Sequence, residues 1–256
     1  MKRFSFRGLV GPLALATLSL AGCKKDIPAD ATGTFTLEMQ HVVGSAPLDL
    51  SAATYQNANG DDFTVSTFKY YLSNIRLRRA DNSTYLVPES YFLVDQAKAE
   101  TRVLRLSGVP VGDYTGIGFT VGIDSARTKE GRFTGVLNAN NGMFWDMNGP
   151  EFINLKLEGT SPQARTGGLV FHIAGYKQST TNTIRTVMLP LPGGGLPIRA
   201  DRSPQLYAKA NVLKLFTGPH QIDFSRIYNT MGGPNAAKVA DNLAAGLFSI
   251  DRIVSQ

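Results

Sequence analysis

Three histidines are the residues of this 256-residue chain best suited to bind a transition metal or to move a proton. His41 ends an apolar strand face, and His172 shares a strand face with Val170 and Ala174. Each pattern is typical of a histidine in the core. The same pattern also allows His41 and His172 to converge from separate strands on one metal ion, while the surroundings of His220 indicate nothing further.

A second unusual feature is the only tryptophan, Trp145, which stands between Met143 and Met147. In an extended segment these three side chains project to the same side. They could close one end of a hydrophobic core through sulfur–aromatic contacts. Alternatively, they could form a soft-ligand site, because thioether sulfur and imidazole nitrogen suit Cu(I).

Other motifs give no support to an enzyme. Residues 57–62 carry oxygen ligands near a glycine, but they lack the spacing and the distal glutamate of a calcium loop, so we expect a hairpin turn. Gly232-Gly233-Pro234 lacks the Gly-Lys-Ser/Thr ending of a phosphate loop. No Gly-x-Ser-x-Gly motif is present. We therefore expect a binding protein without catalytic residues.

The first 22 residues have the pattern of an export signal. Three basic residues, Lys2, Arg3 and Arg7, precede a mostly apolar run over 8–20 that is too short to span a bilayer. The run ends in Leu20-Ala21-Gly22-Cys23, which resembles a bacterial lipobox. This predicts a signal peptide over 1–22, a lipidated Cys23, and an outer-membrane lipoprotein on either the periplasmic or the cell-surface face.

Composition narrows the possible partners of the mature chain. Cys23 is the only cysteine, so the domain can form no disulfide and has no thiolate metal ligand. The chain has 26 basic residues, and removal of the three in the predicted signal peptide leaves 23, against 20 acidic residues. This near balance predicts no nucleic-acid partner. We expect a monomer attached to the membrane through its lipid.

The remaining chain alternates apolar and polar residues in short segments separated by turn residues. About nine to ten such segments predict an all-β fold, an antiparallel β-sandwich, in one domain over 33–256 after a tether over 23–32. On the segment over 65–79, Tyr70 and Tyr71 should point to opposite faces. One short C-terminal helix is predicted from Gly233-Pro234 to about Gly246, before a last strand over 247–254.

Several segments together are more specific than any one of them. They are His41-Val42-Val43-Gly44, the run over 63–77, Gly122-Ile123-Asp124-Ser125-Ala126-Arg127, Gly142-Met143-Phe144-Trp145, Lys156-Leu157-Glu158-Gly159, Phe171-His172-Ile173 and Ala240-Asp241-Asn242. In this order and spacing, over about 33–254, the chain resembles the MbnP-like copper-binding proteins of methanobactin gene clusters. The surface copper proteins MopE and CorA are relatives of that family, and the resemblance is to its Bacteroidetes-type lipoprotein members.

The resemblance implies a β-sandwich that binds copper, as Cu(I), through histidine imidazoles. In some members a tryptophan oxidised to kynurenine is a further ligand, and a di-haem oxidase of the MauG type is the partner that forms it. Carried over to this chain, the resemblance makes Trp145 the tryptophan to be modified. It makes His41 and His172 the candidate imidazole ligands.

The chain departs from the family pattern at three places. Met147 stands where relatives have a second tryptophan or a histidine, Met231 is followed by Gly232 instead of a histidine, and residues 252–254 lack the C-terminal histidine. One reading is a thioether-assisted copper site that uses Met147 or Met231.

The other reading is a surface module that has lost copper binding and that either has a structural role or binds a glycan or another ligand. In that case exposed aromatics such as Tyr55, Tyr85 or Tyr91 would matter more than the histidines. Imidazoles of His41 and His172 more than about 8 Å apart, without a shared cavity, would favour this second reading, because metal–nitrogen bonds are about 2 Å long.

Overall fold

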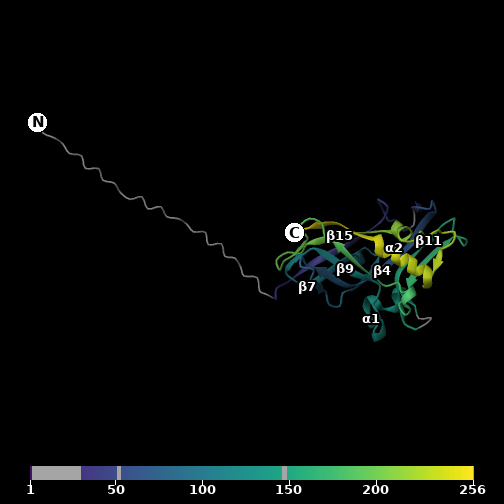
Figure 1. Cartoon of the computed structure of the whole chain (residues 1–256), viewed down its shortest axis with the longest axis horizontal. Coiled ribbons are helices and arrows are strands. Elements are labelled where there is room, and N and C mark those ends of the chain that lie inside the picture. The colour runs from purple at the N-terminus through teal and green to yellow at the C-terminus, as the bar shows by residue number, and fades with distance from the viewer. Residues whose placement is uncertain (2–29, 51–52, 146–148, 256) are drawn as a thin grey trace.

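Two β-sheets pack face to face in a computed structural model that describes residues 1, 30–50, 53–145 and 149–255 (Figure 1). Residues 2–22 of the predicted signal peptide, Cys23 and Met147 lie outside the described residues. The described part contains seventeen strand segments. Ten of them span five or more residues, namely β1, β4, β6, β7, β9, β11, β12, β13, β15 and β17.

The smaller sheet is built around the first strand of the domain. Its order is β17 (Phe248–Val254), β15 (Gln205–Asn211), β1 (Thr32–Val43) and β2 (Ala46–Pro47), and β7 (Val103–Pro110) also pairs with β1. Phe35, Leu37 and Met39 of β1 are buried, and His41 continues the same face. The alternation in the sequence therefore predicts the inward face of β1 correctly.

The larger sheet is built around the 17-residue strand β4. Its order is β13 (Arg185–Pro190), β9 (Gly116–Val121), β4 (Asp62–Arg78), β11 (Glu151–Thr160), β12 (Gly168–Ala174) and β16 (Asn229–Thr230). Four short strands flank this path: β3 (Tyr55–Gln56), β5 (Thr84–Leu86), β6 (Tyr91–Asp95) and β10 (Phe144–Trp145). A separate two-stranded ribbon joins β8 (Gly112–Tyr114) and β14 (Leu196–Ile198).

The predicted all-β sandwich is confirmed, with one correction to strand direction. The sheets are mixed, because β1 pairs with β15 in parallel and β12 pairs with β16 in parallel. Parallel neighbours need a long crossover connection, and the chain between β1 and β15 supplies one. Short turns between consecutive segments suggest only antiparallel hairpins, so the sequence pattern does not reveal these pairs.

Both faces of the larger sheet carry apolar clusters. Phe68 and Tyr70 of β4 lie in the main core between the sheets, while Tyr71 lies in a second cluster on the other face. We call that other face, which points away from the smaller sheet, the outer face. The second cluster includes Met143 and Phe152, and Trp145 packs against it. The segment that follows β9 thus covers a patch of sheet that would otherwise be exposed.

The predicted C-terminal helix is also confirmed. Helix α2 (Gly233–Gly246) has proline in its first turn and buries Ala236, Val239 and Leu243. A six-residue helix, α1 (Ser125–Glu130), begins after Asp124, whose side chain accepts a hydrogen bond from the Arg127 N–H. The short 3-10 helices are η1 (Ala99–Arg102), η2 (Gly135–Leu137), η3 (Ala139–Asn141), η4 (Ser179–Thr181) and η5 (Val212–Leu215). Within the described residues, no helix has both the length and the apolar character that crossing a membrane requires.

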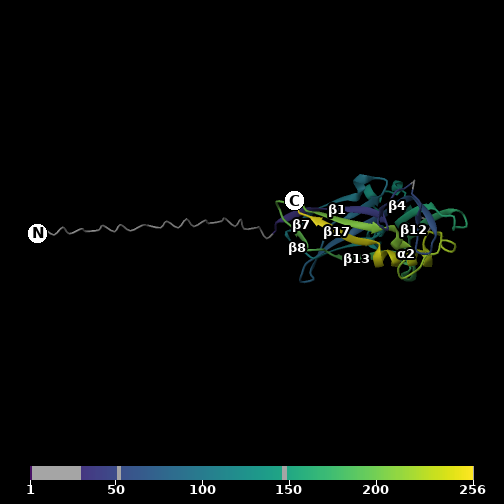
Figure 2. The ribbon, with the colours of Figure 1, turned by 90° about the horizontal axis from the view of Figure 1, so that it is seen from above.

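The two ends of the domain differ in what they carry. Strand β1 begins and β17 ends at one end of the long axis, whereas α2 and strand β12 lie toward the other end (Figures 1 and 2). The N-terminal attachment of the domain is therefore remote from α2.

Candidate metal centre

His41 lies in the main core and uses both ring nitrogens in hydrogen bonds. Its Nδ1 is 2.7 Å from Gln96 Oε1, and its Nε2 is 2.8 Å from Tyr70 Oη. Gln96 donates its amide N–H to the Leu48 carbonyl, so its Oε1 accepts from Nδ1 and the Tyr70 hydroxyl donates to Nε2. Both positions at which a metal could bind are occupied.

Burial also keeps His41 neutral. The side chain is only 4% exposed, and loss of solvent lowers its pKa from the usual 6.5 to about 4, against the opposing effect of the Gln96 hydrogen bond. The rings of Phe68 and Tyr70 pack edge-on against the imidazole at 5.0 and 5.5 Å between centroids. These contacts are those of a core histidine.

His172 points to the outer face of the larger sheet. Its strand neighbours Phe171 and Ile173 both lie in the main core, so the side chain between them projects away from it. His172 also pairs with Lys156 in register, on the face opposite to Leu155 and Leu157. The sheet itself therefore separates His172 from His41, and the two imidazoles do not converge. This geometry argues against a copper site built from both histidines and favours the second reading, unless another donor joins one of them.

One nitrogen of His172 is held and the other has no partner. Nε2 is 2.7 Å from Glu158 Oε1. Burial raises the pKa of Glu158, but hydrogen bonds from His172 and Thr67 and the nearby Lys156 charge hold that pKa below its usual value. The ionised carboxylate can only accept, so Nε2 carries the proton. Nδ1 is buried without a hydrogen-bond partner, and in the neutral ring it presents a free lone pair.

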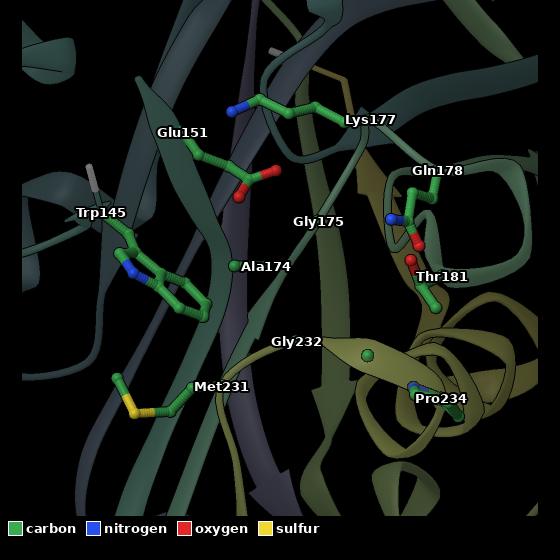
Figure 3. Close-up of a pocket in the computed structure, with 11 residues that line it drawn as sticks. Trp145, Glu151, Ala174, Gly175, Lys177, Gln178, Thr181, Met231, Gly232 and Pro234 are labelled. Atoms are coloured by element: carbon green, nitrogen blue, oxygen red, sulfur yellow. The ribbon is translucent and has the colours of Figure 1, made fainter. Parts of the chain in front are cut away.

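Trp145 lines a pocket of about 650 Å³ between the outer face of the sheet and the start of α2 (Figure 3). Strand β10 positions it, because Trp145 pairs with Glu151 and Phe144 with Phe152 of β11. The indole Nε1 is buried and has no hydrogen-bond partner. Figure 3 shows the indole and the Met231 side chain on one side of the pocket, with Gln178 and Thr181 on the other.

Met231 joins this pocket from the segment before α2. Its side chain is 43% exposed and lines the pocket with Trp145 and Ala174. Phe171 of β12 is paired in parallel with Thr230 of β16, so His172 and Met231 are the next residues along each chain. Adjacent strands are about 4.8 Å apart, and we therefore expect the backbones of His172 and Met231 to lie side by side on the outer face.

Gly232 explains one departure from the family pattern. Its φ is +121°, a conformation that L-residues rarely adopt. A Cβ at this position would lie 3.5 Å from Trp145 Cζ3 and 3.6 Å from Cη2. The backbone of this chain therefore disfavours a histidine at position 232 and leaves Met231 as the nearest donor.

The remaining candidates lie elsewhere. Met147 is in the segment outside the described residues, so its prediction as a ligand is neither supported nor contradicted. His220 Nε2 is 3.1 Å from Asp241 Oδ2, beside the Arg185–Asp241 ion pair. The hydroxyls of Tyr55, Tyr85 and Tyr91 form hydrogen bonds within the domain, to the Asp49 N–H, the Gly108 carbonyl and the Asp124 carboxylate.

The donor set of the outer face fits a soft cation. In the described part of the chain, no group of three or more His, Cys, Asp and Glu residues could hold a metal ion. A metal here would thus depend on a thioether together with the unpartnered Nδ1 of His172. Cu(I) accepts few ligands and favours sulfur and imidazole, so these residues suit it better than a hard cation.

Sequence reasoning missed two parts of this arrangement. Glu158 orients His172. The sequence indication for this was that Glu158 lies two residues after Lys156, and therefore on the same face of the strand that pairs with β12. The proximity of Met231 to Trp145 had no signal in the sequence, because 85 residues separate them and only the β12–β16 pairing brings them together.

The fold and the pocket define a class of protein: a two-sheet β-module with the His172 imidazole on the outer face of its larger sheet and a pocket lined by Trp145 and the Met231 thioether. The model of the MbnP family matches residues 32–232, and the chain belongs to this family. The solved structure of MbnP from Methylosinus trichosporium is similar, with a TM-score of 0.57, 12% identity, and coverage of 88% of this chain and 99% of that chain. At this identity the likeness shows the fold. No curated protein matches the chain.

Proposed function

We propose that the chain is an exported, lipid-anchored protein that binds copper for its acquisition or handling, and that it is not an enzyme. Copper is its cargo, bound as Cu(I) by His172 and Met231 beside Trp145. The observation that carries the proposal is the buried Nδ1 of His172, which has no partner while Glu158 holds Nε2. Family membership supports it, since the resemblance implies copper.

The Glu158–His172 pair has the form expected behind a metal ligand. Ligating histidines usually donate their second ring N–H to a carboxylate, which sets the tautomer and the ring orientation. A histidine that served only packing would leave no buried acceptor unpaired, because such an atom costs about 1–3 kcal/mol. The cost is recovered when a cation binds at Nδ1.

Trp145 is the proposed site of kynurenine formation. Its Nε1 makes no hydrogen bond in the described structure and its ring lines an open pocket, so no internal contact blocks an oxidising partner of the di-haem MauG type. Peptide mass spectrometry of protein from the native host tests this. The expected result is a Trp145 peptide with the mass of kynurenine, and unmodified tryptophan in every condition would contradict it.

Cys23 is the proposed lipid anchor, and its position before the domain bears on which end of the domain faces the membrane. The domain begins at the end of its long axis remote from α2, so we expect the end that carries α2 to lie away from the anchor (Figures 1 and 2). Cys23→Ser should release the protein from the membrane fraction into the soluble one. If the variant stays in the membrane fraction, the anchor is not at Cys23.

The copper proposal is tested by metal content after expression in the native host. We compare the wild type with His172→Ala and Met231→Leu, and use as histidine controls His220→Ala and His41→Gln, since Asp241 and Tyr70 hold the Nε2 atoms of these two histidines. Copper should be lost in His172→Ala, reduced in Met231→Leu, and retained in both controls. Equal copper in all five proteins, or loss in the controls alone, would contradict the assignment.

A second candidate rests on the size of the pocket. A volume of about 650 Å³ exceeds what one ion needs and lies in the range of small-molecule sites. An organic ligand stacked on Trp145 would quench its fluorescence in a metal-free protein, and that binding would survive His172→Ala. If the protein binds copper and no such organic ligand, only the first proposal is supported.

A further inference from the structure

Methionines in the described part of this domain are divided sharply by exposure. Met39 and Met143 are 1% and 0% exposed, whereas Met188 and Met231 are 36% and 43% exposed. Of these four methionines, only the exposed pair can react readily with oxidants dissolved in the surrounding water. Two sites of similar exposure therefore differ only in where they lie.

Met188 and Met231 have different neighbours. Met188 is on β13, where its Cε lies over Gly118 of the adjacent strand β9. Met231 lines the pocket that contains Trp145, the only tryptophan. A change in the polarity of Met231 is therefore reported by the one indole of the chain, and a change at Met188 is not.

We propose that Met231 is a redox switch of this site, reversibly oxidised to its sulfoxide by a peroxide. This inference rests on the proposed copper function, because the property switched is the affinity for Cu(I). The thioether is a donor only while sulfur keeps its soft lone pair.

The oxidation is a balanced two-electron step. The sulfur lone pair attacks one oxygen of hydrogen peroxide, the O–O bond breaks, and the second oxygen leaves as water after proton transfer. Sulfur is oxidised to the sulfoxide and peroxide is reduced. A methionine sulfoxide reductase reverses the change.

Location outside the cytoplasm makes such a switch useful. Oxidants are met there before they reach the cell interior, and the chain holds no cysteine in its mature domain other than the predicted lipidated Cys23. The mature domain therefore has no free thiol that could serve in redox regulation. Among the described residues, the thioether that is exposed in this pocket belongs to Met231.

The first test does not involve copper. The full-length, metal-free protein, expressed without the di-haem oxidase so that Trp145 is unmodified, is treated with hydrogen peroxide, and peptide mass spectrometry is combined with Trp145 fluorescence. Oxidation should occur at Met188 and Met231 and spare Met39 and Met143. The change in Trp145 emission should be present in Met188→Leu and absent in Met231→Leu. Failure of Met231 to oxidise, or an emission change that persists in Met231→Leu, would overturn the switch.

The second test measures Cu(I) affinity by chelator competition, before oxidation, after it, and after treatment with the reductase. Oxidised wild type and Met188→Leu should bind Cu(I) about tenfold more weakly, and the reductase should restore the affinity. Met231→Leu should show no further loss on oxidation.

The outcomes separate the two proposals. If Cu(I) binding is normal in the reduced protein and unchanged by Met231 oxidation, the switch is wrong and the copper function stands. If Met231→Leu still loses affinity on oxidation, the switch lies at another residue, with Met147 the next methionine to examine. If the reduced protein does not bind Cu(I), the copper function fails and the switch fails with it.

Discussion

His41 is the residue at which a structural role and a metal-binding role make opposite predictions. Its two nitrogens are held by Gln96 and Tyr70, and its ring is buried among aromatic side chains. The perturbation that tests this is His41→Gln, which removes the titrating group and keeps a polar side chain able to form hydrogen bonds.

The magnitude follows from the pKa. It is 6.5 in the unfolded chain and about 4 in the folded domain, because burial disfavours the imidazolium. Between these values the unfolded state binds more protons, so stability rises with pH. The contribution of neutral His41 is fully present above about pH 6.5 and is lost as the pH falls to about 4. This difference corresponds to about 3 kcal/mol.

The assay is urea unfolding at several pH values between 4 and 7, followed by Trp145 fluorescence and circular dichroism. Between pH 7 and pH 4 the wild type should lose about 3 kcal/mol more unfolding free energy than His41→Gln. Carboxyl groups with lowered pKa, such as Asp241, also lose their stabilisation on acidification. They are present in both proteins, and their effect cancels in the comparison.

Parallel stability curves for the two proteins would refute the reasoning. That result would mean that His41 titrates in the folded domain as it does in the unfolded chain, and that its buried, neutral state is wrong. A copper-dependent stabilisation present in the wild type and lost in His41→Gln, but retained in His172→Ala, would also contradict the placement of the metal on the outer face.

Four further outcomes are expected. Gly159→Ala should destabilise the domain by about 3 kcal/mol in urea unfolding, because the added Cβ would lie 1.9 Å from the Thr64 carbonyl oxygen of the neighbouring strand β4. Asn242→Ala should cost about 3 kcal/mol and increase hydrogen exchange at residues 215–220, since this fully buried amide bonds the His220 N–H and carbonyl and the Leu215 carbonyl. Tyr70→Phe should cost about 1–2 kcal/mol in the same assay, because it leaves the Nε2 of His41 unpaired. Cu(I) at about 100 times its Kd should raise the unfolding free energy of the wild type by about 2.7 kcal/mol, and that of His172→Ala by much less.

Each of these has a clear contrary result. Wild-type stability in Gly159→Ala would mean that β4 and β11 do not approach so closely at this point. Unchanged exchange in Asn242→Ala would show that the loop before α2 does not depend on this amide. If Tyr70→Phe had the unfolding free energy of the wild type, this would argue against the hydrogen bond to His41. If Cu(I) stabilised His172→Ala as much as the wild type, the ion would bind elsewhere.

Local pattern was sufficient for most of the secondary structure. The alternation along β1 and β4 identifies which residues share a face, and the opposite orientations of Tyr70 and Tyr71 follow directly from it. Pro234 and Gly246 marked the two ends of α2. These features depend on residues only a few positions apart in the chain, so they can be predicted directly from the sequence.

The partners of the strands were not accessible in this way. Strand β1 is joined in parallel to β15, about 170 residues later in the chain, a choice made by the packing of the whole core. The antiparallel expectation was wrong at this pair and at β12–β16 for the same reason. Nothing in a local period of two distinguishes a parallel neighbour from an antiparallel one.

The histidines show the same limit at the level of the site. The sequence by itself determined that His41 and His172 lie on strand faces, that Trp145 is unique, and that Cys23 is the only thiol. Only the tertiary structure decided that one imidazole enters the core while the other points to the outer face, and that Met231 and Trp145 line one pocket. Alternation gives the relative orientation of residues within a strand, but which side becomes the interior depends on the sheet that packs against it.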